Sequence, residues 1–153
     1  MDKFKKLKGL VYHIILKELD RKIEVINKAI AIAKDSRNND TKSSAGDKYE
    51  TSREMMQIEI EKNEVVLNQT AKQRKELARI DISENFNKVA FGSLVETDKG
   101  TYFISIGLGK IQIDDRICYA ISLASPIGAL LKNKIVGDEL AFQGRTFLIK
   151  AIV

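Results

Sequence analysis

The sequence has few of the residues on which several common classes of protein depend. Its 153 residues include one cysteine, one histidine and one proline, and they include no tryptophan. A single cysteine excludes an internal disulfide framework, and a single histidine argues against His-based catalytic triads and His-rich metal sites. Any chemistry in which the chain takes part must therefore rely on its carboxylates.

Long apolar runs are also missing. No stretch approaches the roughly 18 consecutive apolar residues that a membrane-spanning helix needs. The N-terminal MDKFKKLKGLVYHIIL places basic residues before apolar ones, as signal peptides do, but Lys8 interrupts the apolar run and no small-residue cleavage site follows. We therefore expect a cytoplasmic protein with no membrane partner.

The first half of the chain has the apolar spacing of two long helices. In the first arm, apolar residues recur every three or four positions: Phe4, Leu7, Val11, Ile15, Leu19, Ile23, Ile26, Ile30 and Ala33. The second arm, from about residue 49 to residue 80, has a less regular stripe at Met56, Ile60, Leu67 and Leu77. Two arms of nearly equal length predict an antiparallel coiled-coil hairpin over residues 1–82, because neither helix would be stable alone in water.

The connection between the arms is polar and carries acids. Residues 36–50 contain small and turn-forming side chains, which predict the tip of the hairpin. Asp40, Asp47 and Glu50 lie in this tip. Asp47 and Glu50 also have the spacing of a helix-capping pair, so a purely structural role is the alternative interpretation.

Residues 83–153 lack the helical spacing of the first half and are rich in β-branched and aromatic residues, with glycines between them. Strands are expected at residues 94–97, 102–106, 110–113, 117–123, 139–142 and 146–152, with turns at 98–100 and 143–144. Pro126 opens PIGALLK and predicts a short helix, because proline is well tolerated at the first helical position. The fold class is therefore α+β, a helical hairpin followed by a small antiparallel β domain with one short helix.

One segment of the β domain resembles a known family. Residues 121–142, ISLASPIGALLKNKIVGDELAF, resemble the C-terminal domain of the GreA/GreB transcript cleavage factors, in which a Ser-Pro-Ile turn, a short helix and a Gly-Asp pair precede the last hairpin. The matching positions are Ser125, Pro126, Ile127, Leu130, Lys134, Gly137 and Asp138. The order of a helical hairpin and then an FKBP-like domain is also that of the family. The resemblance implies that Ser125, Pro126, Ile127, Gly137 and Asp138 belong to a polymerase-binding region.

The tip matches the family in two alternative registers. Tyr49, Arg53 and Glu54 fit the family's Tyr and Arg-Glu positions in one register, which places Lys42 and Ala45 where the family carries its two working acids. In the other register, Gly46, Asp47 and Glu50 reproduce Gly-Asp-x-x-Glu and keep both acids. We prefer the second register for function, because loops absorb insertions more easily than coiled-coil faces do.

The resemblance implies a transcription elongation factor that binds RNA polymerase and inserts its hairpin into the secondary channel. Asp47 and Glu50, with Asp40 as a spare, would help to hold a Mg²⁺ shared with the polymerase active site, and Lys48 or Arg53 would lie near phosphate. The polymerase would then cleave backtracked RNA, whose 3′ end meets the tip. The chain would have no cofactor bound alone, no small-molecule substrate and no enzymatic activity of its own.

Three other functions remain open from the sequence. Factors related to this family can occupy the channel without promoting cleavage, and a coiled-coil adaptor would have the same helical pattern. A prolyl isomerase could use a pocket lined by Tyr102, Phe103, Tyr119, Phe142 and Phe147, although alternating aromatic residues in strands are usually core.

Cys118 lies in an apolar strand and is expected to be a buried thiol.

Overall fold

The computed structural model describes residues 2–39 and 46–153 of the chain. Within its helices, the side chains of Asp2, Asp47 and Tyr49 lie outside what the structure describes. The chain forms two compact units, one made of residues 17–74 and the other of residues 1–16 and 75–153. Among the described residues, no helix combines the length and the apolar character that crossing a bilayer requires.

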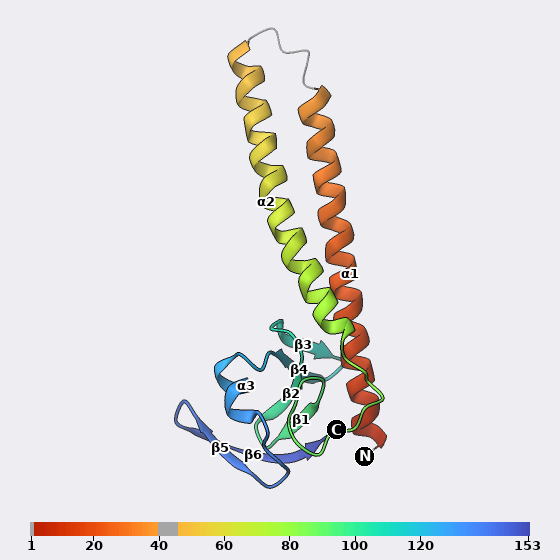
Figure 1. Ribbon diagram of the computed structural model, residues 1–153, viewed down its shortest axis with the longest axis vertical. Coiled ribbons are helices and arrows are strands. Elements are labelled where there is room, and N and C mark those ends of the chain that lie inside the picture. Colours follow the sequence, from red (N-terminus) through yellow and green to blue (C-terminus); the bar gives the residue numbers. More distant parts are fainter. Residues whose placement is uncertain (1, 40–45) are drawn as a thin grey trace. The chain divides into compact units, whose positions relative to one another are not determined.

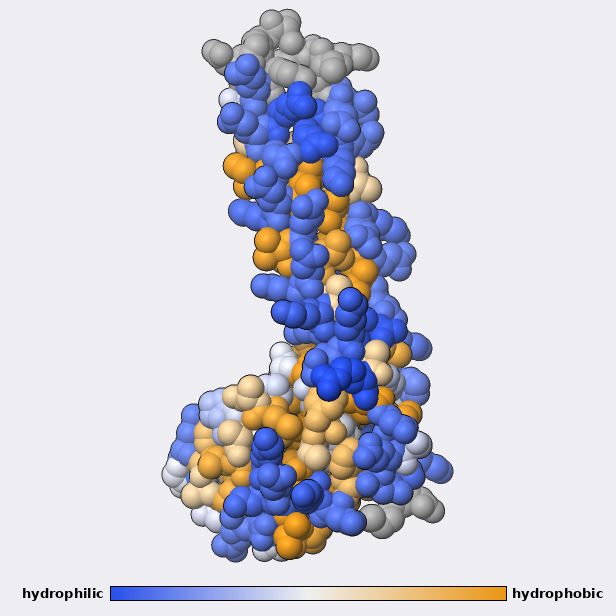
Figure 2. All heavy atoms as spheres, in the orientation of Figure 1, coloured by the Kyte–Doolittle hydropathy of each residue, from blue (hydrophilic) through white to orange (hydrophobic). Residues whose placement is uncertain are grey.

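The first unit is an antiparallel pair of helices, taken from α1 (Asp2–Asn39) and α2 (Gly46–Ala78). The two helices run side by side (Figure 1), and hydrophobic residues gather along the middle of the pair (Figure 2). Ile26, Ile30 and Ala33 of α1 pack with Ile60 of α2, and the half-buried Met56 and Leu67 border them. The predicted apolar stripes therefore form the contact between the arms.

The helices extend further toward the tip than the sequence predicts. Residues 36–39 are still helical, and α2 begins at Gly46, so the expected tip at 36–50 is mostly helix. Residues 40–45 lie outside the described residues, and a side-chain hydrogen bond supports the end of α1. Asn39 Nδ2 donates to Asp35 Oδ1 one turn earlier, at 2.7 Å.

The second unit contains a six-stranded sheet with the order β3–β4–β2–β1–β6–β5. Its strands are β1 (Leu94–Thr97), β2 (Gly100–Ile104), β3 (Gly109–Ile113), β4 (Arg116–Ile121), β5 (Glu139–Phe142) and β6 (Arg145–Ile152). Each overlaps an expected strand, although β2 begins and ends two residues earlier than predicted. The β5–β6 turn has Gln143 and Gly144 at positive φ, 52° and 75°, the backbone of a tight hairpin turn. The α+β class expected from the sequence is confirmed.

One strand pairing departs from the expected antiparallel sheet. β2 and β4 are parallel, with Tyr102 opposite Tyr119, while the other strand pairs are antiparallel. β3 follows β2 in the chain but pairs only with β4, at the edge of the sheet. This arrangement places a parallel neighbour beside β2 and leaves β3 with one open side.

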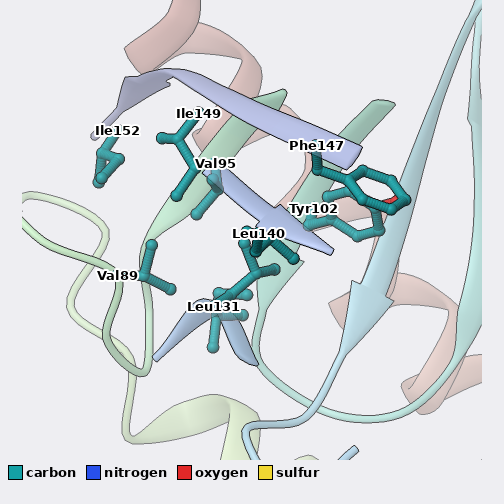
Figure 3. Close-up of a cluster of buried hydrophobic side chains, with 9 residues drawn as sticks. Val89, Val95, Tyr102, Leu131, Leu140, Phe147, Ile149 and Ile152 are labelled. Carbon is teal, nitrogen blue, oxygen red and sulfur yellow. The ribbon is translucent and has the colours of Figure 1, made fainter. Parts of the chain in front are cut away.

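A buried cluster on one side of the sheet joins the strands to α3 (Pro126–Leu131). Figure 3 shows its side chains converging from separate elements. The cluster consists of Val89, Val95, Tyr102, Ile104, Leu131, Leu140, Phe147, Ile149 and Ile152. Cys118 is buried as predicted, and burial raises the pKa of its thiol to about 12. The thiol is therefore a core group and not a nucleophile at neutral pH.

Lys8 connects the start of α1 to the segment that follows α2. Its side chain is fully buried, and its Nζ donates to the backbone oxygen of Glu84 at 2.8 Å and lies 4.8 Å from the centre of the Phe86 ring. Burial lowers the pKa of the amine, and the charge of Lys5 lowers it further. Because the folded-state pKa is below the unfolded value, burying the charge offsets part of the stability that the Lys8 contacts contribute at neutral pH, and this offset falls as the pH rises through the folded-state pKa.

The Lys8→Ala variant should lose about 2–4 kcal/mol of unfolding free energy, because it leaves a cavity and an unpaired carbonyl oxygen at Glu84. Urea denaturation followed by circular dichroism measures this difference. The matched control is Lys5→Ala, an exposed lysine of the same helix, which should change stability by less than about 0.5 kcal/mol. Equal stability of the Lys8 and Lys5 variants would show that the buried amine does not anchor the segment.

Candidate functional site

The first turns of α2 and the last turn of α1 bring acids and arginines together near the tip. Arg53 and Glu54 lie three and four residues after Glu50 and four and three residues before Gln57, so the four residues lie along one side of α2. Arg37 of α1 joins them, and its Nη1 donates to Gln57 Oε1 at 2.6 Å. These five residues line a cavity of about 310 Å³, which we call the tip site.

The tip site offers two complementary kinds of group. Glu50 and Glu54 are exposed carboxylates, the hard oxygen ligands that Mg²⁺ prefers, and Mg²⁺ usually takes one or two carboxylates together with substrate phosphates. Arg37 and Arg53 carry guanidinium groups, whose planar donors suit phosphate oxygens. The residues present therefore fit a metal ion that is shared with a phosphate-bearing partner. Among the described residues, no group of three or more potential metal-binding side chains forms a site by itself.

The predicted tip acids are only partly described. Glu50 lines the tip site and is exposed. Asp47 lies in the first turn of α2, on the same side of the helix as residue 50, but its side chain is outside the described residues. Asp40, Lys42 and Ala45 also lie outside the described residues, so the choice between the two registers stays a prediction.

Arg37 and its partner Gln57 are the members of the tip site that were not predicted from the sequence. The signal lay at Arg37. It lies four residues after Ala33, at the next position of the stripe formed by Ile26, Ile30 and Ala33. Arg37 is polar although it occupies a position of the apolar stripe, so the apolar contact between the two helices ends there. That interruption of the stripe was the available signal.

The segment that resembles the Gre family is held by its own capping interactions. Ser125 is the N-cap of α3, and its Oγ accepts from the backbone N–H of Gly128 at 3.0 Å while donating to the backbone oxygen of Ser122 at 2.7 Å. Pro126 occupies the first turn, as predicted. Ser125 and Pro126 therefore fix where α3 begins, and Ile127 packs half-buried against the core cluster.

The Gly-Asp pair fixes the turn before β5. Gly137 has φ +94°, a backbone conformation that favours glycine. Asp138 Oδ2 accepts from the backbone N–H of Ile135 at 2.9 Å, and the backbones of Gly137 and Asp138 both bond to Ile149 of β6. These two residues shape the segment between α3 and β5.

Three exposed residues of this segment are large and apolar. Leu130 is 40% exposed, Ile135 52% and Val136 54%. We call these three residues the α3–β5 patch. The sequence predicted the residues on either side of this patch, Ser125, Pro126, Gly137 and Asp138, but it did not predict a role for Ile135 or Val136. Two adjacent β-branched residues outside any expected strand were the signal for them.

Comparison of the sequence with models of known protein families gave no match, and comparison with curated proteins gave none either.

Gly128 leaves no room for a side chain. A Cβ at position 128 would lie 2.0 Å from the backbone oxygen of Ser122 and 2.8 Å from Ser125 Oγ. Gly128→Ala should therefore displace the Ser125 cap and destabilise the protein by about 3 kcal/mol, measured by urea denaturation. Gly9→Ala is the control, because nothing lies within 4 Å of the added carbon and the substitution favours helix by about 0.5–1 kcal/mol. A Gly128 variant as stable as the Gly9 variant would refute the close contact.

Proposed function

We propose that this chain is a Gre-like transcription elongation factor that binds RNA polymerase, inserts its hairpin into the secondary channel and stimulates cleavage of backtracked RNA. The observation that carries the proposal is the tip site, where Glu50 and Glu54 lie with Arg37 and Arg53 at the end of a long helix pair. A narrow helical pair suits entry into a channel. The resemblance of residues 121–142 to the family's C-terminal domain supports the same function.

In this proposal the tip residues act on the RNA inside the polymerase. The arginines hold the phosphate of the backtracked strand by charge-assisted hydrogen bonds. Glu50 and Asp47 accept hydrogen bonds from a water and orient it toward the phosphorus. The same two carboxylates would help to hold a Mg²⁺ shared with the polymerase, which would supply charge neutralisation and lower the pKa of a bound water. The polymerase performs the cleavage, and the chain completes its site.

The α3–β5 patch is the proposed contact with the polymerase. Leu130, Ile135 and Val136 expose apolar surface on a segment whose backbone is fixed by Ser125, Gly128 and Asp138. Rigid exposed apolar groups suit a protein interface, because little conformational entropy is lost on binding. The capped α3 segment thus acts as a support and the patch as the contact.

A halted, backtracked elongation complex tests the tip residues. The wild-type chain should shorten the transcript faster than buffer alone, and Asp47→Ala/Glu50→Ala should lower that rate by about 100-fold or more, since such losses follow removal of groups that act in the transition state. The matched control is Glu59→Ala/Glu64→Ala, which removes two exposed acids further along the same helix. Cleavage by the double tip variant at the wild-type rate would show that the tip acids are assigned wrongly.

Two further outcomes separate binding from cleavage in the same assay. Ile135→Asp/Val136→Asp should lose both co-purification with RNA polymerase and cleavage, whereas the tip variant should keep binding. If the wild type binds the polymerase but cleaves no faster than buffer, the chain is a channel-binding regulator without cleavage activity. If it does not bind, the adaptor function takes the place of the proposal.

A further inference from the structure

One face of the sheet carries an aromatic pair that the buried core only partly covers. Tyr102 of β2 and Tyr119 of β4 lie opposite each other in the parallel pairing, with ring centres 5.7 Å apart and planes inclined by 29°. Tyr102 is 8% exposed and joins the core cluster shown in Figure 3, whereas Tyr119 is 36% exposed. The pair is therefore a stack whose outer ring is open to solvent.

The register of the sheet extends this stack toward the edge of the domain. Lys110 of β3 lies directly opposite Tyr119, and on the same face the next row pairs Gln112 with Ile117. Ile117 is 39% exposed, and Lys110 and Gln112 are exposed. The two rows across β3 and β4 thus present an aromatic ring, an aliphatic side chain and a cation to solvent, while Gln112 Nε2 donates to the backbone oxygens of Asp114 and Arg116. The exposed carboxylates of Asp114 and Asp115 lie outside these rows, in the turn between β3 and β4.

A second cation lies on β6, which the sheet order places on the opposite side of β2 from β4. Arg145, the first residue of β6, is exposed, and its charge acts on the Tyr102 hydroxyl, lowering a phenol pKa that burial and Tyr119 raise. Within the described part of the chain, neither Lys110 nor Arg145 forms an ion pair. Lys99, by contrast, is engaged with Asp98 and the backbone oxygen of Thr146.

The chemistry of this face selects its ligand. An exposed ring that is held rigidly by a second ring offers a surface on which a planar base can stack, and unpaired cations on both sides attract phosphate. Exposed aromatic residues on a β-sheet recognise unstacked bases in single-stranded RNA in the same way. An apolar protein partner would not need the two cations.

We propose that the face formed by Tyr119, Ile117 and Lys110, with Arg145 beside it, is a binding site for single-stranded RNA. One base stacks on Tyr119, and the flanking phosphates contact Lys110 and Arg145. The site lies within the unit that contains the sheet, and it does not depend on the tip site or on polymerase binding. Its test therefore needs no polymerase, and its failure leaves the proposed function standing.

The test is fluorescence anisotropy of a labelled single-stranded RNA of about 12 nucleotides, titrated with the full chain at low salt. Tyr119→Ala should raise the Kd at least about fivefold, while Tyr119→Phe, which keeps the ring, should bind as the wild type does. Tyr119→Leu keeps apolar bulk without a planar ring and should bind as weakly as the alanine variant. Unchanged urea midpoints would establish that these variants remain folded.

The charge variants separate this site from general electrostatic attraction. Lys110→Ala and Arg145→Ala should each reduce the salt dependence of binding by about one phosphate contact, whereas Lys150→Ala, a control at an exposed lysine of β6, should not. Equal weakening by all three would overturn the proposal, as would wild-type binding by Tyr119→Ala. Equal affinity for duplex RNA, full competition by a mononucleotide at strand concentration, or no binding by the wild type would overturn it too.

Discussion

The apolar contact between α1 and α2 is the interaction on which the proposed function depends. Ile26, Ile30 and Ala33 bury themselves against Ile60, and neither helix would hold its shape in water without the other, because most helical stability in proteins comes from such packing. The contact ends where Arg37 replaces the apolar side chain and bonds to Gln57. The same helix pair thus provides a stiff arm and, where its core stops, a polar site with groups from both helices.

In the β domain, local hydrogen bonds and close backbone packing, and not apolar helix packing, fix the segment that carries exposed residues. Ser125 caps α3, Gly128 allows the backbone of Ser122 to approach, and Asp138 closes the turn before β5. The polar side chains of Ser125 and Asp138 form hydrogen bonds within the segment, while Ile135 and Val136 remain exposed. A candidate binding surface can therefore consist of exposed residues that belong to no recognisable motif, while the motif residues next to them fix the backbone.

Much of this fold could be predicted from the sequence, because its patterns are local. The apolar stripe of α1, the glycine-punctuated strands and the proline at the start of α3 each follow from spacing or backbone geometry. The parallel pairing of β2 with β4 could not be predicted, since it depends on contacts between distant strands. α1 extends to Asn39, beyond the point at which the turn-forming residues predicted its end. Residue types alone do not reveal the hydrogen bond from Asn39 to Asp35 that supports this last turn.

Only some residues of the candidate sites could be predicted from the sequence. Glu50 and Arg53 could be found from their spacing, whereas Arg37 joins them only through the pairing of the helices. Tyr119 belongs to a set of strand aromatics that we expected to be core, and only the sheet register shows that its ring lies in an outer row beside Lys110.

The most direct measurement places a photoreactive 4-thiouridine at the 3′ end of the RNA in a backtracked elongation complex and maps the crosslinks after illumination. If the tip meets the RNA in the polymerase active site, the RNA will crosslink to this chain within residues 46–57. Crosslinks to the polymerase alone, with the chain bound, would contradict the account.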